Sequence, residues 1–191
     1  MIRFPPEERA FTRRYLRGTE PHVSEERYDP AEAPKRVLLE SGHKAIPDFV
    51  AIHARLGLSP EARALVEEFE PGVHQFLPVE VVRARGKRPI HRLDGSVLDA
   101  PLYLFIPQTI IDAVWVERSS VQVSATYLGP PLVVPHLGSN KIVLRRGMVE
   151  GRHVWRGRFH LPRRVFFSDA LVRAVKERKL RGLESVHLEE A

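Results

Sequence analysis

The residues of this chain best suited to metal binding or proton transfer are nine histidines, and they are scattered along it. A zincin-type metal site needs two histidines four residues apart on one helical face, and no pair here has that spacing. His153 and His160 lie seven residues apart, but in a basic stretch that offers a cation few carboxylates. The histidines therefore indicate solvated or core side chains. We expect neither a metal nor another cofactor.

The other arrangements that carry enzyme chemistry are also missing from the sequence. There is no cysteine, and the pairs Gly95-Ser96 and Gly138-Ser139 lack the Gly-x-Ser-x-Gly frame of a strained nucleophile turn. The glycines form no phosphate-binding loop. The acidic run Glu67-Glu68-Glu70 lies at the end of an expected helix, where a solvated face is the more frequent explanation. We therefore expect a protein that is not an enzyme.

The charge of the chain is concentrated in one segment. Residues 141–164 contain eight Lys or Arg and a single acid, which gives the segment a charge of +7 within a chain of net charge +6. The remaining 22 basic and 23 acidic residues nearly cancel. Such asymmetry indicates a partner with an acidic surface, whether protein, nucleic acid or membrane.

Two groups of arginines are candidates for a basic binding surface. Alternation along an expected strand 153–159 places Trp155 on a core-facing side and projects Arg156 and Arg158 outward. Arg83 and Arg85 lie at the end of another expected strand, 79–85, and Arg88 follows it. Arginines on solvent-facing strand positions also discourage edge-to-edge aggregation. This structural explanation has the same weight as a basic binding surface.

Three helices can be argued from start and stop signals. Ser59 and Pro60 begin one helix that ends before Pro71-Gly72, and its apolar residues fall on one face. Ser168 caps a second, which ends at Gly182. A third is expected from Pro47 to about Leu56, closed by Gly57.

Between the helices the pattern predicts β-strands, separated by turns rich in Gly, Pro, Asn and Asp. The expected strands are 79–85, 102–106, 113–116, 121–127, 141–144, 153–159 and 165–167, with a further one at 183–188. Early and late helices around a block of strands predict a single α+β domain, with helices packed against a mostly antiparallel sheet. We place this domain at residues 37–191. Residues 1–36 are expected to form an irregular arm with at most a short helix near residues 7–16.

Several short motifs, taken in order, resemble a known family. They are the Ser59-capped helix followed by Leu77-Pro78-Val79-Glu80, then Ile111-Asp112 and Ser119-Ser120, then the stretch Gly151-Arg152-His153-Val154-Trp155-Arg156, and last Leu180-Arg181-Gly182 after the Ser168 helix. Over residues 46–188 this order is similar to the immunity-protein family numbered eleven of bacterial polymorphic-toxin systems. The resemblance implies a cytoplasmic protein that neutralises a secreted toxin by direct stoichiometric binding. It carries over no catalytic residues.

The anchors available for such binding are tryptophans and arginines, since these residue types dominate interface hot spots. They are Arg83, Arg85, Arg88, Trp115, Trp155, Arg156 and Arg158. Each tryptophan is expected in the core twice as readily as in an interface. The main alternative is a basic nucleic-acid-binding or regulatory module, although no helix-turn-helix pattern supports it. No stretch is long and apolar enough to suggest a membrane span, and the oligomeric state is left open.

Overall fold

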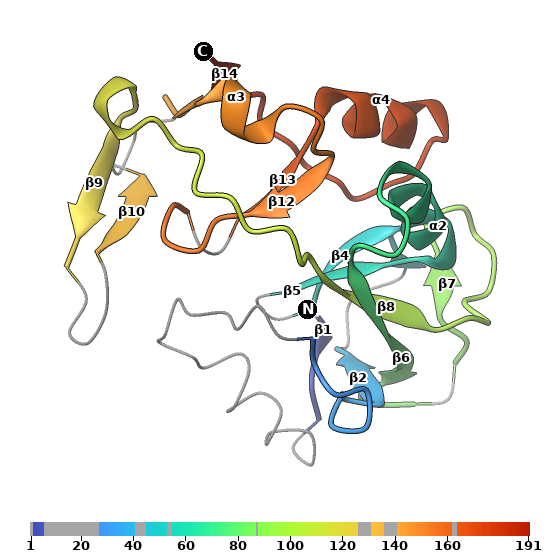
Figure 1. The fold of residues 1–191 in the computed structure, drawn as a ribbon. Coiled ribbons are helices and arrows are strands. Elements are labelled where there is room, and N and C mark those ends of the chain that lie inside the picture. The colour runs from blue at the N-terminus through green and yellow to red at the C-terminus, as the bar shows by residue number, and fades with distance from the viewer. Residues whose placement is uncertain are drawn as a thin grey trace.

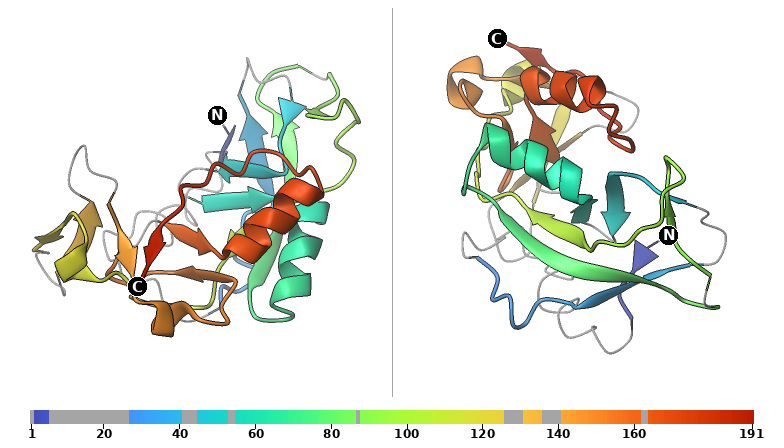
Figure 2. Two further views of the ribbon diagram at one scale, coloured as in Figure 1. Left: turned by 90° about the horizontal axis from the view of Figure 1, so that it is seen from above. Right: turned by 90° about the vertical axis from the view of Figure 1, so that its right-hand side faces the viewer.

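The fold is described from a computed structural model that shows residues 2–5, 27–40, 45–52, 55–86, 88–125, 131–135, 141–161 and 164–191. A strand barrel occupies one side of the molecule and a smaller group of hairpins the other, and two helices lie where the two parts meet (Figure 1). Figure 2 shows the same arrangement from above and from the side.

Six strands close into a barrel in the order β1-β2-β6-β8-β5-β4. They are β1 (Ile2–Arg3), β2 (Arg36–Leu39), β4 (Phe49–Ile52), β5 (Arg55–Leu58), β6 (Gln75–Arg83) and β8 (Leu102–Ile106). Four neighbouring pairs are antiparallel, whereas β2 with β6 and β1 with β4 are parallel. The expectation of a mostly antiparallel sheet is therefore confirmed only in part, because two parallel contacts are needed to close this mixed barrel.

The interior of the barrel is a compact apolar cluster that includes both ends of the segment expected to be an arm. Ile2 and Tyr28 are buried in it beside Val37 and Leu77. The buried Gln75 side chain binds the backbone of Tyr28 at both ends: its Oε1 accepts from Tyr28 N at 2.9 Å and its Nε2 donates to Tyr28 O at 2.7 Å. The expected helix at 7–16 lies outside the described residues, and the domain division at residue 36 remains a prediction.

The helix expected over 47–56 is wrong. Strands β4 and β5 pair antiparallel there instead, with Phe49 opposite Leu58 and Ile52 opposite Arg55. Short apolar runs fit a helix or a strand equally well. Here the strand conformation allows Phe49, Ile52 and Leu58 to be buried together. Gly57 allows the close approach of the two strands, since a Cβ on it would lie 2.5 Å from the Ile52 side chain.

The other two expected helices are confirmed. Helix α2 (Pro60–Phe69) begins at Ser59, whose hydroxyl accepts from Ala62 N at 3.2 Å. Helix α4 (Asp169–Glu177) begins at Ser168, which caps Leu171 N in the same way. Both pack into one cluster with Phe105 of the barrel and Val154 of the second part. None of the described helices has the length and apolar character needed to span a bilayer.

The second part of the molecule consists of two-stranded pairs. They are β9 (Val121–Ser124) with β10 (Leu132–Pro135), β12 (Val154–Arg156) with β13 (Val165–Phe167), and β11 (Val143–Leu144) with β14 (Glu189–Glu190). A one-turn helix α3 (Arg146–Val149) and a 3-10 turn η3 (Val116–Arg118) complete it. Trp155, Phe166 and Val133 are among its core residues.

Several strand predictions change in this part. The strand expected at 113–116 is replaced by a single bridge of Val114 to Leu144 and by η3. The final strand expected at 183–188 begins later, as β14. Both segments have strand-like composition, but neither has a neighbour positioned to form a full ladder. A further small pair, β3 (Ala45–Ile46) with β7 (His91–Arg92), lies beside the barrel.

A buried polar network joins the two parts. Glu70, at the end of α2, bonds His74 Nε2 through one oxygen and accepts from His153 N at 2.8 Å through the other. His74 Nδ1 accepts from Gln108 N at 3.2 Å, and His153 Nδ1 lies 2.9 Å from the Ser168 hydroxyl. The network thus links α2, the chain after β8, β12 and the cap of α4. It explains two of the nine histidines as structural groups.

Candidate functional site

The seven residues predicted to bind a partner do not form one site. Arg83, Arg85 and Arg88 lie at the end of β6, Trp115 lies before η3, and Trp155, Arg156 and Arg158 lie in or after β12. Their role in recognition remains a prediction. Their surroundings nevertheless separate those that present a surface from those that do not.

At the end of β6, Arg83 holds the following turn. Its Nε donates to Arg88 O at 2.9 Å and its Nη2 to Pro89 O, also at 2.9 Å. Its guanidinium is thus used to brace the chain as it leaves the barrel. Arg85 and Arg88 are exposed, and they are the residues of this group that could meet a partner.

The expectation that Arg156 projects outward is wrong. Arg156 is 3% exposed and its Nε donates to Pro107 O at 2.8 Å, while its Nη1 has no partner among the described residues. Burial lowers the pKa of this guanidinium to about 10, and the nearby positive charge of Arg55 adds to the effect. Alternation along β12 fails as a guide because all three of its residues are buried, and the segment 109–111 pairs with the strand at Arg156 through backbone hydrogen bonds.

Trp155 is a core residue, in line with the more frequent role expected for it. It is 3% exposed and its ring stacks on Phe166 with centroids 5.4 Å apart. Its indole Nε1 is buried without a hydrogen-bond partner in the described structure. A buried donor without an acceptor destabilises the folded state, so the unpaired indole N–H of Trp155 calls for an explanation.

Arg158 lies in a tight turn organised by Asp112, part of the Ile-Asp motif. One oxygen, Asp112 Oδ1, accepts from the backbone N–H groups of three successive residues, Arg158, Phe159 and His160, at 2.8, 3.0 and 2.9 Å. Gly157 begins the turn, and a Cβ there would lie 1.6 Å from His160 O. The motif residue is therefore explained by the fold, and it determines where Arg158 points.

We expect Asp112→Ala to lower the free energy of unfolding by roughly 3 kcal/mol, because three partly buried donors lose a charged acceptor. Asp112→Asn retains an acceptor oxygen and is expected to lose about 1 kcal/mol. Urea titration followed by circular dichroism measures both. Equal stability of Asp112→Ala and the unmodified protein would contradict this role.

Of the two tryptophans predicted to bind a partner, Trp115 is the one that is partly exposed. The guanidinium carbons of Arg118 and Arg145 lie 5.0 and 5.9 Å from the centroid of its ring, close enough for cation–π contact. Arg118 pairs with Glu189 at 3.4 Å and Arg145 with Glu117 at 3.7 Å. We call Trp115, Arg118 and Arg145 the tryptophan patch. Neither arginine is among the binding residues predicted from the sequence. Arg145 in particular comes near Trp115 only through folding, which joins Trp115 N to Val143 O.

Ser119, in the second short motif, supports this patch from beneath. Its hydroxyl donates to Trp115 O at 2.7 Å and accepts from Val143 N at 2.9 Å. It therefore fixes the end of η3 against β11. Like Asp112, this motif residue is a determinant of the fold that places a candidate binding residue.

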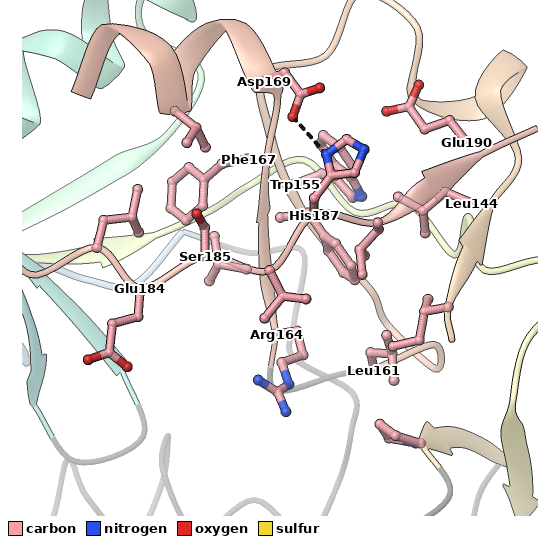
Figure 3. Close-up of a pocket in the computed structure, with 18 of the residues that line it drawn as sticks. Leu144, Trp155, Leu161, Arg164, Phe167, Asp169, Glu184, Ser185, His187 and Glu190 are labelled. Atoms are coloured by element: carbon pink, nitrogen blue, oxygen red, sulfur yellow. Dashed lines mark ion pairs between the residues drawn. The ribbon is translucent and has the colours of Figure 1, made fainter. Parts of the chain in front are cut away.

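A cavity of about 700 Å³ opens beside the core of the second part (Figure 3). Its apolar lining includes Trp155, Phe167 and Leu144, and the chain from 182 to 188 crosses it. Charged side chains surround it, among them Arg164 and Glu184. Within the described ranges, no group of three or more histidine or carboxylate side chains is placed to hold a metal ion.

The family model for the Imm11 immunity proteins matches residues 8–189. The chain therefore belongs to the Imm11 immunity protein family, as the motifs indicated. The match extends well beyond residues 46–188, over which the resemblance was noticed, and includes much of the segment expected to be an arm. Among curated proteins, none matches the chain.

Proposed function

We propose that this protein is a non-catalytic immunity protein that neutralises a cognate secreted toxin by direct stoichiometric binding in the cytoplasm of the producing cell. The observation that carries the proposal is the family match over nearly the whole chain. Binding alone can block a toxin, so the absence of recognisable catalytic motifs in the sequence is compatible with this role.

The tryptophan patch is the surface we propose for toxin contact. Trp and Arg dominate interface hot spots because they bury large areas and also form directional polar contacts. Here two arginines flank the Trp115 ring, and the Ser119 hydroxyl holds the Trp115 backbone carbonyl. A surface fixed before binding loses less conformational entropy on association.

The charge around the patch supports an acidic contact surface on the toxin. Arg118, Arg145 and Arg146 are about half exposed or more, and their ion pairs with Glu189, Glu117 and Glu190 measure 3.4, 3.7 and 3.9 Å. Exposed pairs of this kind contribute only about 0–1 kcal/mol each. Carboxylates of a partner could therefore replace the internal glutamates at little cost.

The nucleic-acid alternative has less support from the arrangement of the basic segment 141–164. Arg156 is buried, and Arg145 and Arg146 are paired with acids, so the described residues of the segment do not form a continuous basic stripe. Strong retention on immobilised DNA that falls steeply with salt would revive this alternative.

The test is co-expression with the toxin domain encoded by the neighbouring gene, measuring cell survival and the stoichiometry of the purified complex. We expect the unmodified chain to rescue growth and to form a complex of fixed stoichiometry. Trp115→Ala and the double reversal Arg118→Glu with Arg145→Glu are each expected to weaken toxin binding at least about tenfold.

Two control variants locate the interface. Arg173→Glu reverses an exposed charge on α4 and is expected to leave affinity within about twofold, since isolated surface charges outside an interface contribute little. The double reversal Arg85→Glu with Arg88→Glu tests the end of β6. Loss of binding there, with the tryptophan patch variants unaffected, would move the interface to the barrel. Failure of the unmodified chain to rescue growth or bind an active toxin would overturn the proposal.

A further inference from the structure

The cavity in the second part has the size and lining of a binding site. Its volume of about 700 Å³ falls within the range of pockets that accept a small molecule or a large side chain. β12 and β13 supply Trp155 and Phe167, β11 supplies Leu144, and α4 supplies Val172. Figure 3 shows Phe167 and Leu144 on opposite sides of the cavity. The floor is rigid, because Trp155 stacks on Phe166 between paired strands.

The cover of this cavity is residues 182–188, which we call the strap. Residues 182–187 make no backbone hydrogen bond to the described residues beyond strand pairing. An ion pair of 3.4 Å joins His187 to Asp169 of α4, and both side chains are more than 70% exposed. Val186 is 73% exposed, so this apolar residue does not fill the cavity beneath it. The strap is held at its two ends, where Leu183 and Leu188 pack against the neighbouring cores, but residues 184–187 between them have few contacts and are inexpensive to displace.

Trp155, one of the residues that line the cavity, carries a buried donor that lacks an acceptor. Trp155 is 3% exposed, and its Nε1 has no partner among the described residues. Because an unsatisfied buried N–H is costly, an occupant that brings a carbonyl oxygen to this atom would gain affinity from it. Trp155 therefore favours an occupant with both an apolar body and an acceptor, as an apolar residue of a peptide has.

The cavity borders the tryptophan patch. The paired strands β11 and β14 separate them: Leu144 and Glu190 line the cavity, whereas the next residue along, Arg145, and the preceding one, Glu189, belong to the patch and its ion pairs. A protein bound at the patch would therefore lie beside the cavity. This proximity points to the toxin itself as the occupant.

We propose that the cavity receives an apolar side chain from an extended segment of the toxin, with the strap displaced and a main-chain carbonyl accepting from Trp155 Nε1. The inference rests on the proposed function and deepens it, because it assigns the anchor point and the chemistry of the residue bound there. An apolar side chain enclosed in a pocket at the edge of an aromatic and arginine-rich patch is a typical hot-spot arrangement.

The experiment follows the Trp155 indole N–H signal by NMR in the full-length protein labelled at tryptophan, as the neighbouring gene's toxin domain is added. Trp115→Phe identifies the Trp115 signal by its loss, so that the remaining indole signal is assigned to Trp155. We expect the Trp155 signal to move downfield, as it does when an indole gains an acceptor, and to saturate at one equivalent.

A matched pair of variants gives a second measurement. Val172→Phe places a ring in the cavity from α4, whereas Ala170→Phe places the same ring on the exposed side of that helix. We expect the first to weaken toxin binding at least about tenfold and the second to leave it within about twofold. Thermal unfolding confirms that both variants are folded.

The outcomes separate this inference from the proposed function. A complex with a shifted Trp155 signal and weakened binding by Val172→Phe supports both. A complex in which the Trp155 signal stays unchanged, or in which the two phenylalanine variants bind equally, overturns the cavity proposal alone. The absence of any complex with an active toxin domain overturns the proposed function and, with it, this inference.

Discussion

Replacing Gly182 by alanine is expected to lower the free energy of unfolding by roughly 3 kcal/mol or more. Gly182 has φ +92°, where an L side chain is strained. Its added Cβ would also lie 2.2 Å from Phe49 O and 2.6 Å from Pro47 Cβ. Neither atom can move freely, because Phe49 is in β4 and its N–H donates to Arg181 O at 2.9 Å.

The effect should reach beyond the residue itself, because this crossing attaches the C-terminal part of the chain to the barrel. Asp48 Oδ2 accepts from Arg181 N at 2.8 Å, and Asp48 Oδ1 accepts from Ser59 Oγ and from Arg92 Nη2, each at 2.9 Å. Arg92 also pairs with Glu61 of α2. A displaced Gly182 therefore disturbs the start of α2 as well as the start of the strap.

A glycine elsewhere in the chain provides the control. Gly147 lies in α3 with nothing within 4 Å of an added Cβ, so Gly147→Ala is expected to leave stability unchanged or raise it by up to about 1 kcal/mol. Thermal and urea unfolding of both variants measure the difference. Equal stability of the two would show that the crossing at Gly182 is not tight.

The stability of the protein is expected to fall as pH is lowered below 6.5, and His74 is a principal cause. Burial lowers the pKa of His74 below its ordinary value of 6.5, against the opposing influence of Glu70. The unfolded chain therefore takes up a proton on this residue at a higher pH than the folded chain does. Stability is then complete above pH 6.5 and declines as the pH falls towards the folded pKa.

The contacts of His74 explain why the neutral form is retained. Nδ1 accepts from Gln108 N, which leaves Nε2 to carry the proton and donate to Glu70. The neutral ring thus satisfies both neighbours while it packs edge-on against Phe105. Burial also lowers the pKa of His160, so its contribution to stability has the same sign.

Urea unfolding between pH 5 and pH 7.5 tests this dependence. Each such histidine contributes a slope of at most about 1.4 kcal/mol per pH unit. His74→Gln retains an amide donor towards Glu70 but does not titrate, so its stability should depend less on pH although it is lower at pH 7.5. The same pH slope for both proteins would exclude His74 as a source of the effect.

Local signals in the sequence predicted the two helices at the junction well. Ser59 and Ser168 each precede a helix with an acid in its first turn, and capping of this kind depends only on neighbouring residues. The same holds for the strands at 102–106 and 165–167, whose composition and flanking turns agree with their structure. The family resemblance likewise rested on short ordered motifs and is confirmed by the match over 8–189.

The closure of the barrel could not be predicted in this way. Its parallel contacts join β2 to β6 and β1 to β4, segments more than 40 residues apart, and the strand at 2–3 is too short to produce any pattern. The sequence predicts a helix where β4 and β5 pair, because the few apolar residues of this region fit either period. The partners needed to distinguish the two exist only after the chain has folded.

The family, the capped helices and the residue types suited to an interface follow from the amino-acid sequence alone, because these depend on local chemistry and order along the chain. Which of those residues present a surface depends on tertiary packing. Arg156 and Trp155 are enclosed by segments distant in sequence, whereas Trp115 gains Arg145 as a neighbour across 30 residues. Burial is a property of packing, so alternation along one strand cannot establish it when both faces of that strand are covered.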